Sequence, residues 1–474
     1  MQRRTFLKSG ALAVSAAATP AALEAATSGK SGKQPNIVFI MADDLGYADL
    51  GCYGSRSIKT PAIDALARAG VKLTDGYSNS AVCSSTRVGL VTGRYQYRLP
   101  CGLAEPLISD DLGLPEDEDT LPKSLQKLGY RTVLVGKWHI GGGKKYNPLR
   151  AGYDHFFGIT GGGGDYFAHT LRLGPIVAGG LVEGETQVER QGYLTDLIGD
   201  RAVQEVRDAR AENKPLYMSV HFTAPHSPWE GPEDEELAKT VGNSFHTDGG
   251  NLETYGKMVE SMDQNIAKIV EELKALGMID NTIIIFTSDN GGERFSDVWP
   301  FTGAKTELLE GGIRVPIIAS WPGHIPAGSE TSQMMISMDF VPTLLRAAGV
   351  KKIEPGRFDG EDLLDVLTGK AEPHSRKLYW RYKAVDQAAI RDGDWKYLRM
   401  GEREFLFNLA EDAHERANKI RLEPERYAAM KADWQAWNDT MLPYKETTPS
   451  HGIADFLADR YAPDHEGGLK LPSF

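Results

Sequence analysis

A cysteine and an arginine four residues apart form the first candidate for chemistry in this chain. The pattern after Cys83 predicts a helix over residues 84–91, with Cys83 at its start. Residues four apart share one face of a helix, so Arg87 is expected on the same face as Cys83. Because the N-terminus of a helix attracts anions through its free N–H groups, a reactive side chain and a guanidinium would meet at an anion site. The alternative is a buried structural cysteine with a surface arginine.

Further polar side chains follow apolar segments at the point where each segment ends. After four such segments come Asp43 and Asp44, Lys137 and His139, His226, and Asp289 and Asn290. If the segments are parallel strands, their carboxyl ends meet at one edge of a sheet, which is where α/β proteins bind ligands. Any one of these residues could form only a turn, but the four ends together predict one site. His221 lies within the third segment and is predicted to be a core histidine.

The four apolar segments have the composition of strands that are buried on both faces. They cover residues 36–41, 131–135, 215–222 and 282–286, and their apolar residues run nearly without alternation. Helical patterns lie between them, over residues 61–69 (with Thr60 as the expected N-cap), 120–128, 195–212 and 252–276. This alternation predicts the α/β class, with a doubly wound, mostly parallel sheet.

The pattern changes after residue 375. Short strand-like segments at residues 377–382, 387–391, 395–398 and 404–407 precede a helical pattern over residues 424–437. We therefore expect a smaller antiparallel sheet with a terminal helix. The predicted organisation is a catalytic domain at residues 35–375 and a C-terminal subdomain at residues 376–474.

The composition is that of a folded protein without a strong affinity for polyanions. The 474 residues are 41% hydrophobic and 25% charged, and 53 basic against 65 acidic residues give a net charge of −12. With no basic stripe, nucleic acid is excluded as the main partner, and an anionic substrate must be bound by local cations. No apolar run reaches the length of a transmembrane helix. Three cysteines are too few for a disulfide framework and leave at least one thiol unpaired.

Residues 1–34 predict an export signal and a linker outside the fold. Arg3 and Arg4 precede Phe-Leu-Lys and a weakly apolar, alanine-rich stretch. The paired arginines resemble a twin-arginine signal, so we expect the protein to be exported to the periplasm or the extracellular space. A chance pair of arginines in a disordered arm is the alternative.

The segment at Cys83 resembles the signature of the type I sulfatases, the formylglycine-dependent, arylsulfatase-like members of the alkaline phosphatase superfamily. The matching residues are Cys83, Arg87, Thr92, Gly93 and Arg94. Val91 replaces a leucine, and Ser85 replaces the usual proline or alanine, which bears on acceptance by the maturation enzyme. Further matches occur in order over residues 35–440, at 43–51, 136–139, 224–226, 288–292 and 303–316.

This resemblance implies an alkaline-phosphatase-like fold, hydrolysis of sulfuric esters and a bound divalent cation, Ca²⁺ in this family. The implied metal ligands are Asp43, Asp44, Asp289, Asn290 and the modified Cys83. Hard oxygen ligands suit Ca²⁺ or Mg²⁺ and do not suit Zn²⁺, and the residue types alone do not choose between the first two. Binding of the metal by Asp49 or His139 instead is the alternative.

The same resemblance implies a role for each remaining site residue. Cys83 would become formylglycine, whose hydrate attacks sulfur and forms a covalent intermediate, with the metal lowering the pKa of the attacking hydroxyl. The residues implied to neutralise the sulfate are Arg87, Lys137 and Lys305. His139 would take the second proton of the hydrate, and His226 would protonate the leaving oxygen.

Long segments between the strands predict the substrate class. Residues 141–190, 227–250 and 293–302 carry side chains suited to sugars, namely Asp165, Tyr166, Phe167, His169, Trp229 and Trp299. We expect a sulfated carbohydrate, with Phe167 and Trp229 contacting it, unless these rings only pack the loops. The expected partners are this substrate and a formylglycine-generating maturation enzyme. The alternatives are a phosphomonoester or phosphonate hydrolase on the same fold, and an unmatured, non-catalytic protein that binds sulfated glycans.

Overall fold

A ten-stranded sheet forms the centre of the computed structural model, which describes residues 34–104, 111–242, 244 and 250–445. Its five central strands are parallel and lie in the order β11 (Thr282–Ser288), β1 (Asn36–Ala42), β10 (Leu216–His221), β4 (Arg131–Lys137) and β5 (His155–Ile159). Four of these are the four strands expected from the sequence, and they are adjacent. The predicted α/β class with a mostly parallel sheet is confirmed, whereas the expected export signal lies outside the described residues.

Shorter strands extend this sheet at both edges. On one side they are β12 (Ile317–Ser320), β2 (Val71–Leu73) and β13 (Ser329–Thr331), and on the other β8 (Leu181–Glu183) and β9 (Thr186–Gln187). Two-stranded pairs outside the main sheet are β3 (Gly76–Tyr77) with β14 (Met335–Ile336), and β6 (Leu171–Leu173) with β7 (Ile176–Ala178). Sequence analysis did not identify these strands, because segments of two to four residues carry little periodicity.

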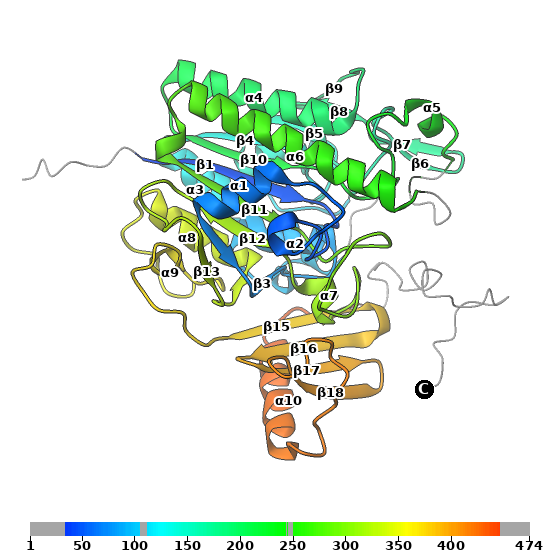
Figure 1. The fold of residues 1–474 in the computed structure, drawn as a ribbon, viewed down its shortest axis with the longest axis vertical. Coiled ribbons are helices and arrows are strands. Elements are labelled where there is room, and N and C mark those ends of the chain that lie inside the picture. Colours follow the sequence, from blue (N-terminus) through cyan, green and yellow to red (C-terminus); the bar gives the residue numbers. More distant parts are fainter. Residues whose placement is uncertain (1–33, 105–110, 243, 245–249, 446–474) are drawn as a thin grey trace, which may run out of the picture. The chain divides into compact units, whose positions relative to one another are not determined.

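Helices cover both faces of the main sheet (Figure 1). One layer consists of α1 (Pro61–Ala69), α4 (Leu194–Glu212) and α6 (Leu252–Ala275), and the other includes α2 (Cys83–Thr92), α3 (Leu121–Lys127) and α8 (Phe340–Ala347). The residues of β1 alternate between these layers, with Val38 and Ile40 in the first and Ile37 and Phe39 in the second. Both faces are thus buried, which explains the continuous apolar runs. The shorter helices are α5 (Glu235–Ala238), α7 (Glu310–Ile313) and α9 (Leu364–Leu367).

The N-terminus of α1 is capped differently from the sequence-based expectation. Thr60 is the N-cap residue, but its hydroxyl donates to Asp64 and accepts from Gly51 N, and so does not cap the helix. The carboxylate of Asp263 on α6 instead accepts hydrogen bonds from Ala62 N and Ile63 N. The cap is therefore a contact between helices, which the local sequence could not reveal.

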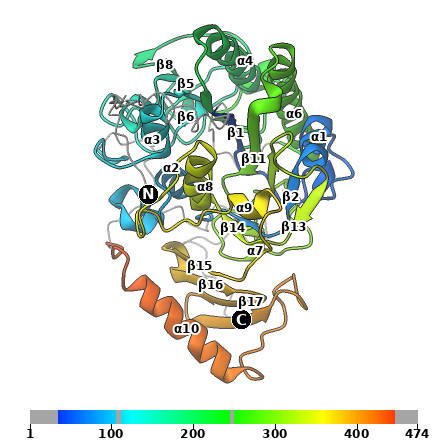
Figure 2. The same ribbon diagram turned by 90° about the vertical axis from the view of Figure 1, so that its left-hand side faces the viewer.

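A second sheet follows, which we call the C-terminal sheet (Figures 1 and 2). It contains β15 (Lys377–Tyr382), β16 (Gln387–Asp392), β17 (Trp395–Met400) and β18 (Arg403–Asn408), all antiparallel, and α10 (Pro424–Asn438) packs on one face. Ile390 and Leu406 face Trp434 of α10, whereas Trp380 and Leu398 pack on the opposite face with Tyr77 of β3. The predicted smaller antiparallel sheet with a terminal helix is confirmed, and the domain boundary after residue 375 stays a prediction.

The structure also bears on the state of the three cysteines and on the presence of a membrane-spanning helix. Cys52, Cys83 and Cys101 are all free thiols. Among the described residues, none of the helices combines the length and the apolar character that a membrane span requires.

Candidate active site

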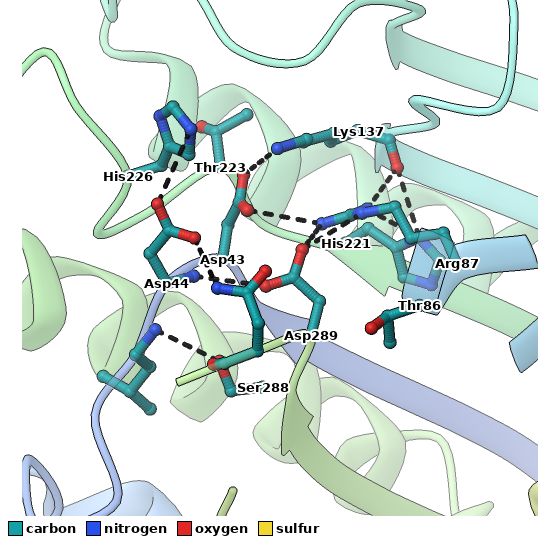
Figure 3. Close-up of polar contacts among 12 residues, drawn as sticks. Asp43, Asp44, Thr86, Arg87, Lys137, His221, Thr223, His226, Ser288 and Asp289 are labelled. Atoms are coloured by element: carbon teal, nitrogen blue, oxygen red, sulfur yellow. Dashed lines mark hydrogen bonds and ion pairs between the residues drawn. The ribbon is translucent and has the colours of Figure 1, made fainter. Parts of the chain in front are cut away.

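The polar side chains that follow the central strands lie together at one edge of the main sheet (Figure 3). Asp43 follows β1, Asp289 follows β11, Lys137 ends β4 and His226 lies beyond the end of β10. Each of these side chains is at most 3% exposed. The strand ends therefore meet as the sequence predicted, in a region from which water is largely excluded.

Helix α2 brings Cys83 and Arg87 to the same edge. The helix begins at Cys83, every one of its residues is buried, and Gly93 ends it in the left-handed region with φ 69°. Arg87 is 0% exposed, so it is not a surface arginine. Its Nε and Nη2 donate to Asp289 Oδ2 at 3.2 and 2.7 Å, and its Nη1 donates to the carbonyl of Lys137 at 2.9 Å. The guanidinium thus links α2 to two strand ends.

Two lysines pair with the two aspartates that follow β1. Lys137 Nζ lies 2.6 Å from Asp43 Oδ2, and Lys305 Nζ lies 2.6 Å from Asp44 Oδ2. Asp44 has φ 64°, and its side chain also accepts from Asn290 Nδ2 at 2.7 Å. Three cations, counting Arg87, therefore face the carboxylates in a buried cluster.

Burial and neighbouring charges shift the pKa values in this cluster in opposite directions. Burial and the nearby Asp289 raise the pKa of Asp43 well above its usual value, despite Lys137. Burial acts in the same direction on Asp44, but Lys305 and His226 outweigh it and lower the pKa of that carboxyl. Burial alone would lower the pKa of Lys305, yet Asp44 raises it well above its usual value. The carboxylates are thus crowded and the lysine stays charged.

Several oxygen atoms in this cluster could hold a cation. Asp43 Oδ1 and Asn290 Oδ1 are buried, and neither has a hydrogen-bond partner in the part of the chain that the structure describes. Asp43, Asp44, Cys83 and His226 each offer one possible ligand atom, and these atoms lie within 4.8 Å of one another. The oxygen donors suit a hard cation such as Ca²⁺ or Mg²⁺, whereas the unmodified thiol of Cys83 does not.

Asp49, one of the alternative metal ligands, uses its carboxylate for hydrogen bonds within the protein. Its carboxylate accepts hydrogen bonds from Gly46 N at 2.8 Å, from the hydroxyl of Tyr255 at 2.5 Å and from Asp297 N at 2.8 Å. Burial raises its pKa to about 7. Asp49 thus joins the loop after β1 to α6 and to the loop after β11.

His226 and His139 differ in what their ring nitrogens contact. His226 Nδ1 lies 2.5 Å from Ser227 O, and its Nε2 lies 3.6 Å from Asp44 Oδ2. His139 is 1% exposed, and neither of its ring nitrogens has a hydrogen-bond partner among the described residues. Burial, and then Lys137 and Arg87, lower its pKa well below the usual value, so the ring is neutral and one nitrogen carries a free lone pair.

His221 is buried as predicted, but it also belongs to the surroundings of the site. Its Nδ1 lies 3.4 Å from Arg87 Nη1 and 3.2 Å from the carbonyl of Lys137 (Figure 3). Burial, followed by the charge of Arg87, lowers the pKa of His221 well below its usual value. A neutral ring can therefore lie beside the guanidinium, a contact that the sequence did not reveal.

A run of four glycines, residues 161–164, lies against two of the histidines. A Cβ atom on Gly162 would lie 2.7 Å from the His139 ring, and one on Gly163 would lie 3.2 Å from the His226 ring. A Cβ on Gly161 would meet no atom within 4 Å. The run is visible in the sequence, but its contact with the site is known only from the structure.

The aromatic side chains expected at the substrate divide into buried and exposed ones. Tyr166 is 0% and Trp229 is 4% exposed, and Phe167 packs against Tyr193 with ring centroids 5.3 Å apart. Burial thus favours the packing alternative for Trp229, whereas contact of the half-buried Phe167 with a sugar stays a prediction. Trp299 is 65% exposed, and its ring centroid lies 5.0 Å from that of His414.

The two polar candidates from the same segments also stabilise loops. Asp165 Oδ1 accepts hydrogen bonds from Phe167 N at 2.8 Å and Ala168 N at 2.6 Å. His169 Nε2 lies 2.9 Å from the carbonyl of Gly192. Both residues are buried, so their contacts favour a structural role.

Known proteins resemble the chain in sequence and in fold. A family model described as Sulfatase matches residues 35–350, and one described as N-sulphoglucosamine sulphohydrolase, C-terminal, matches residues 304–436. The chain is 35% identical to arylsulfatase J of Mus musculus over 79% of its own length and 65% of that protein. It is 32% identical to N-acetylgalactosamine-6-sulfatase of Rattus norvegicus over 70% of its own length and 66% of that protein. The match thus spans just under two thirds of each of these relatives.

A solved structure extends this similarity over nearly the whole described chain. The crystal structure of Ps i-CgsB in complex with k-i-k-neocarrahexaose superposes with a TM-score of 0.79 at 31% identity. The superposition covers 90% of this chain and 98% of that one. Similarity therefore includes both the main sheet and the region that follows it.

Proposed function

Because the chain belongs to the sulfatase family, we propose that it hydrolyses the sulfate ester of a carbohydrate, with formylglycine derived from Cys83 as the nucleophile. One observation carries the proposal. Arg87, Lys137 and Lys305 converge, buried, on the carboxylates next to the start of α2. Cations held rigidly in a site without water stabilise an anion far better than exposed ones do.

The proposed metal is Ca²⁺, with Mg²⁺ as the alternative, held by Asp43, Asp44, Asp289 and Asn290 together with the modified Cys83. Two facts support this set: the oxygens Asp43 Oδ1 and Asn290 Oδ1 have no hydrogen-bond partner, and all the donors of these four residues are hard. When bound, the cation would polarise the sulfate ester and lower the pKa of the attacking hydroxyl. Burial, and then repulsion from Asp289, raise the pKa of Asp43, and a cation would relieve that repulsion.

Cys83 is proposed to be converted to formylglycine, which when hydrated supplies a hydroxyl nucleophile at the start of α2. The spacing to Arg87 supports recognition by a maturation enzyme. Ser85, which departs from the family signature, is 6% exposed in the folded chain, and its hydroxyl donates to Gly102 O at 3.1 Å. The serine thus fits the fold without disturbing α2.

The three cations are proposed to bind the sulfate oxygens, each from a different direction. Arg87 is fixed by Asp289 and the Lys137 carbonyl, and Lys137 by Asp43. Lys305 approaches from the side of Asp44. Since each side chain is already ordered, binding the sulfate requires little reorganisation, and each is expected to contribute about 3 kcal/mol to transition-state stabilisation.

Proton transfer is assigned to His139 and His226. His139 is neutral and has no hydrogen-bond partner on its ring among the described residues, so a ring nitrogen has a free lone pair for a proton from the nucleophile residue. His226 Nε2 lies 3.6 Å from Asp44 Oδ2, beside the cluster that would bind the sulfate, and is assigned to donate a proton to the leaving oxygen.

A glycan substrate is proposed from the relatives and from an exposed aromatic residue in the segment that carries Lys305. Ps i-CgsB was solved with k-i-k-neocarrahexaose, and the chain shares 31% identity with it. The exposed ring of Trp299, six residues before Lys305, offers an apolar face to a sugar. Export through the N-terminal segment would bring the enzyme to extracellular glycans.

The decisive experiment measures product release by the full chain made together with a formylglycine-generating enzyme. Sulfated oligosaccharides, an aryl sulfate and a phosphate monoester are offered in parallel, with Cys83→Ala from the same host as the control. The tryptic peptide 73–87 of the wild type should carry formylglycine by mass spectrometry.

We expect sulfate release that Cys83→Ala lacks. Faster release of phosphate than of sulfate would favour the phosphomonoester hydrolase, and glycan binding without turnover would favour a non-catalytic binding protein. Unmodified cysteine in fully active protein would show that the proposed nucleophile is wrong.

A further inference from the structure

Lys305 lies in a segment without regular secondary structure, between β11 and α7, so tertiary contacts must fix its position. Its side chain is 4% exposed and pairs with Asp44. The next residue, Thr306, has φ 73°, in the left-handed region that β-branched residues avoid. The backbone beside Lys305 therefore needs support from outside the segment.

A side chain of the C-terminal sheet supplies such support. Gln387 is the first residue of β16 and is 1% exposed. Its Nε2 donates to the carbonyl of Thr306 at 2.8 Å, and its Oε1 accepts from Leu308 N at 2.8 Å. One amide thus pairs with a backbone acceptor and a backbone donor two residues apart, as a neighbouring strand would.

Two backbone contacts join the same segment to the main sheet and to α2. Lys305 N donates to Gly292 O at 2.9 Å, beyond the end of β11. Thr306 N donates to Ala81 O at 2.8 Å, two residues before Cys83. Gln387 adds a contact from a separate sheet, so the segment is fixed from different directions.

The C-terminal sheet also fixes the far end of this segment. Lys396 Nζ lies 2.9 Å from Glu310 Oε1 and 2.9 Å from Glu415 Oε1. Glu415 Oε2 accepts from Glu310 N at 2.6 Å. This buried ion cluster holds α7, which begins five residues after Lys305. Gln387 holds the residues that directly follow Lys305.

We propose that Gln387 is a positioning residue, which holds the backbone at Thr306 and Leu308 so that the Lys305 ammonium reaches the sulfate. The inference rests on the proposed function, in which Lys305 neutralises the sulfate. Gln387 acts through Lys305 and does not contact the reacting atoms. A displacement of about 1 Å in an active site costs on the order of 100-fold in rate, so a lost anchor beside Lys305 should be measurable.

The test is a double-mutant cycle on the matured full chain. Gln387→Met keeps the length of the side chain and removes the two hydrogen bonds to the segment at Lys305, together with a third from Nε2 to Ala384 O at 3.1 Å, and should lower kcat/KM for a sulfate ester by about 10- to 100-fold. The inhibition constant of inorganic sulfate should rise with it. In the Lys305→Ala background, Gln387→Met should change kcat/KM by less than about twofold, because residues that act as a unit are not additive.

Trp434→Phe is the matched control for a merely structural effect. It removes a buried hydrogen bond of the same region, from Trp434 Nε1 to the carbonyl of Trp380 at 2.8 Å, without touching the segment at Lys305. Its kcat/KM should equal that of the wild type, even where its melting temperature falls as far as that of Gln387→Met.

Two results would overturn the inference: wild-type kcat/KM in folded Gln387→Met, or an equal loss with and without Lys305. Should Gln387→Met not fold, Gln387→Glu enters the same cycle, since it keeps the acceptor for Leu308 N and loses the donor to Thr306 O. Should the wild type hydrolyse no sulfate ester, the proposed function fails instead. The inference is then tested by calorimetric binding of inorganic sulfate to the proteins of the same cycle: Gln387→Met should weaken binding when Lys305 is present and not when it is absent.

Discussion

The main sheet and the C-terminal sheet each border a buried ionic cluster, but the carboxylate oxygens of the two clusters differ in their contacts. At the end of the main sheet, Asp43 Oδ2 pairs with Lys137, while Asp43 Oδ1 has no hydrogen-bond partner among the described residues and lies 3.7 Å from the Arg87 guanidinium. In the C-terminal sheet, Lys396 lies 2.9 Å from one oxygen of Glu310 and 2.9 Å from one oxygen of Glu415, the latter as an ion pair without a hydrogen bond, and the second oxygen of each glutamate accepts a hydrogen bond. Each glutamate oxygen thus has a cation or a donor within 2.9 Å, whereas Asp43 keeps one oxygen without so close a neighbour, which indicates that the first cluster is prepared for a ligand.

The largest effect should follow loss of a strand-end aspartate in the main sheet. Asp289→Ala removes a proposed metal ligand and the carboxylate that pairs with Arg87 at 2.7 Å, so kcat/KM should fall about 1,000-fold or more. Calcium should restore activity to chelated wild type and not to the variant. The control is Asp392→Ala, at the end of β16, which should leave turnover unchanged. Full activity of the metal-free wild type would contradict the role of the cation.

The next largest effect concerns stability and belongs to the C-terminal sheet. Lys396→Met leaves two buried glutamates without their lysine, so the free energy of unfolding should fall by about 3–5 kcal/mol in urea titrations. Lys431→Met, which removes an exposed lysine paired with Glu404, should cost about 1 kcal/mol or less. Similar losses from both variants would remove the distinction between the buried cluster and a surface pair.

The glycine run beside the site offers a smaller effect on activity. In Gly162→Ala the new methyl group would meet the His139 ring at 2.7 Å, so the ring must move, and kcat/KM should fall by about 10- to 100-fold. Gly161→Ala, one residue earlier, meets no atom within 4 Å and should retain wild-type kinetics. Equal behaviour of the two variants would show that His139 does not need its present position.

A buried glutamate that lacks a lysine should make stability depend on pH. Burial, and then Asp165, raise the pKa of Glu230 to about 8. The folded state therefore holds a proton that the unfolded chain releases near its ordinary pKa, and stability falls as the pH rises towards 8. Between pH 6 and 8 the unfolding free energy of the wild type should drop about 2 kcal/mol more than that of Glu230→Gln. The same change at the exposed Glu233 should leave the wild-type profile intact.

The smallest effect concerns the exposed aromatic residue Trp299. If its ring contacts the glycan, as proposed, Trp299→Ala should weaken turnover of a sulfated oligosaccharide by about two- to tenfold and leave the shorter aryl sulfate unaffected. Trp395→Ala in the C-terminal sheet, where Arg426 lies 4.5 Å from the ring centroid, is the control and should affect neither substrate. Equal losses on both substrates would argue against a sugar contact at Trp299.

The sequence predicted those parts of the molecule whose cause is local. The central strands are long apolar runs because helices cover both faces, and α2 begins at Cys83 as its pattern indicates. Shorter strands such as β12 escaped prediction, because four residues in an edge region show no clear period. Short strand-like segments also identified the C-terminal sheet, and in the structure their residues alternate between α10 and the opposite face.

Contacts between distant parts of the chain account for what the sequence did not predict. The Gln387 side chain contacts the backbone of Thr306, beside Lys305, only because β16 belongs to a separate sheet that packs there. Neither the local sequence pattern nor the composition predicts this contact. Gly162 was visible as part of a glycine run, but its approach to His139 depends on the path of a loop. The burial of Trp229 likewise comes from packing against Phe295, which lies far along the chain.

The central position of β1 has a consequence for how the chain acquires its structure. This strand is among the first residues of the fold, yet its two neighbours are β10 and β11, where Ile37 pairs with Tyr217 and Ile283. During synthesis one of its edges therefore stays open until β10 ends at His221, and the other until β11 ends at Ser288. Such non-local pairing is slow and exposes apolar edges to aggregation. The anchor at Gln387 comes later still, so Lys305 should be among the last groups to reach its final place, and a prematurely ended chain should yield insoluble protein.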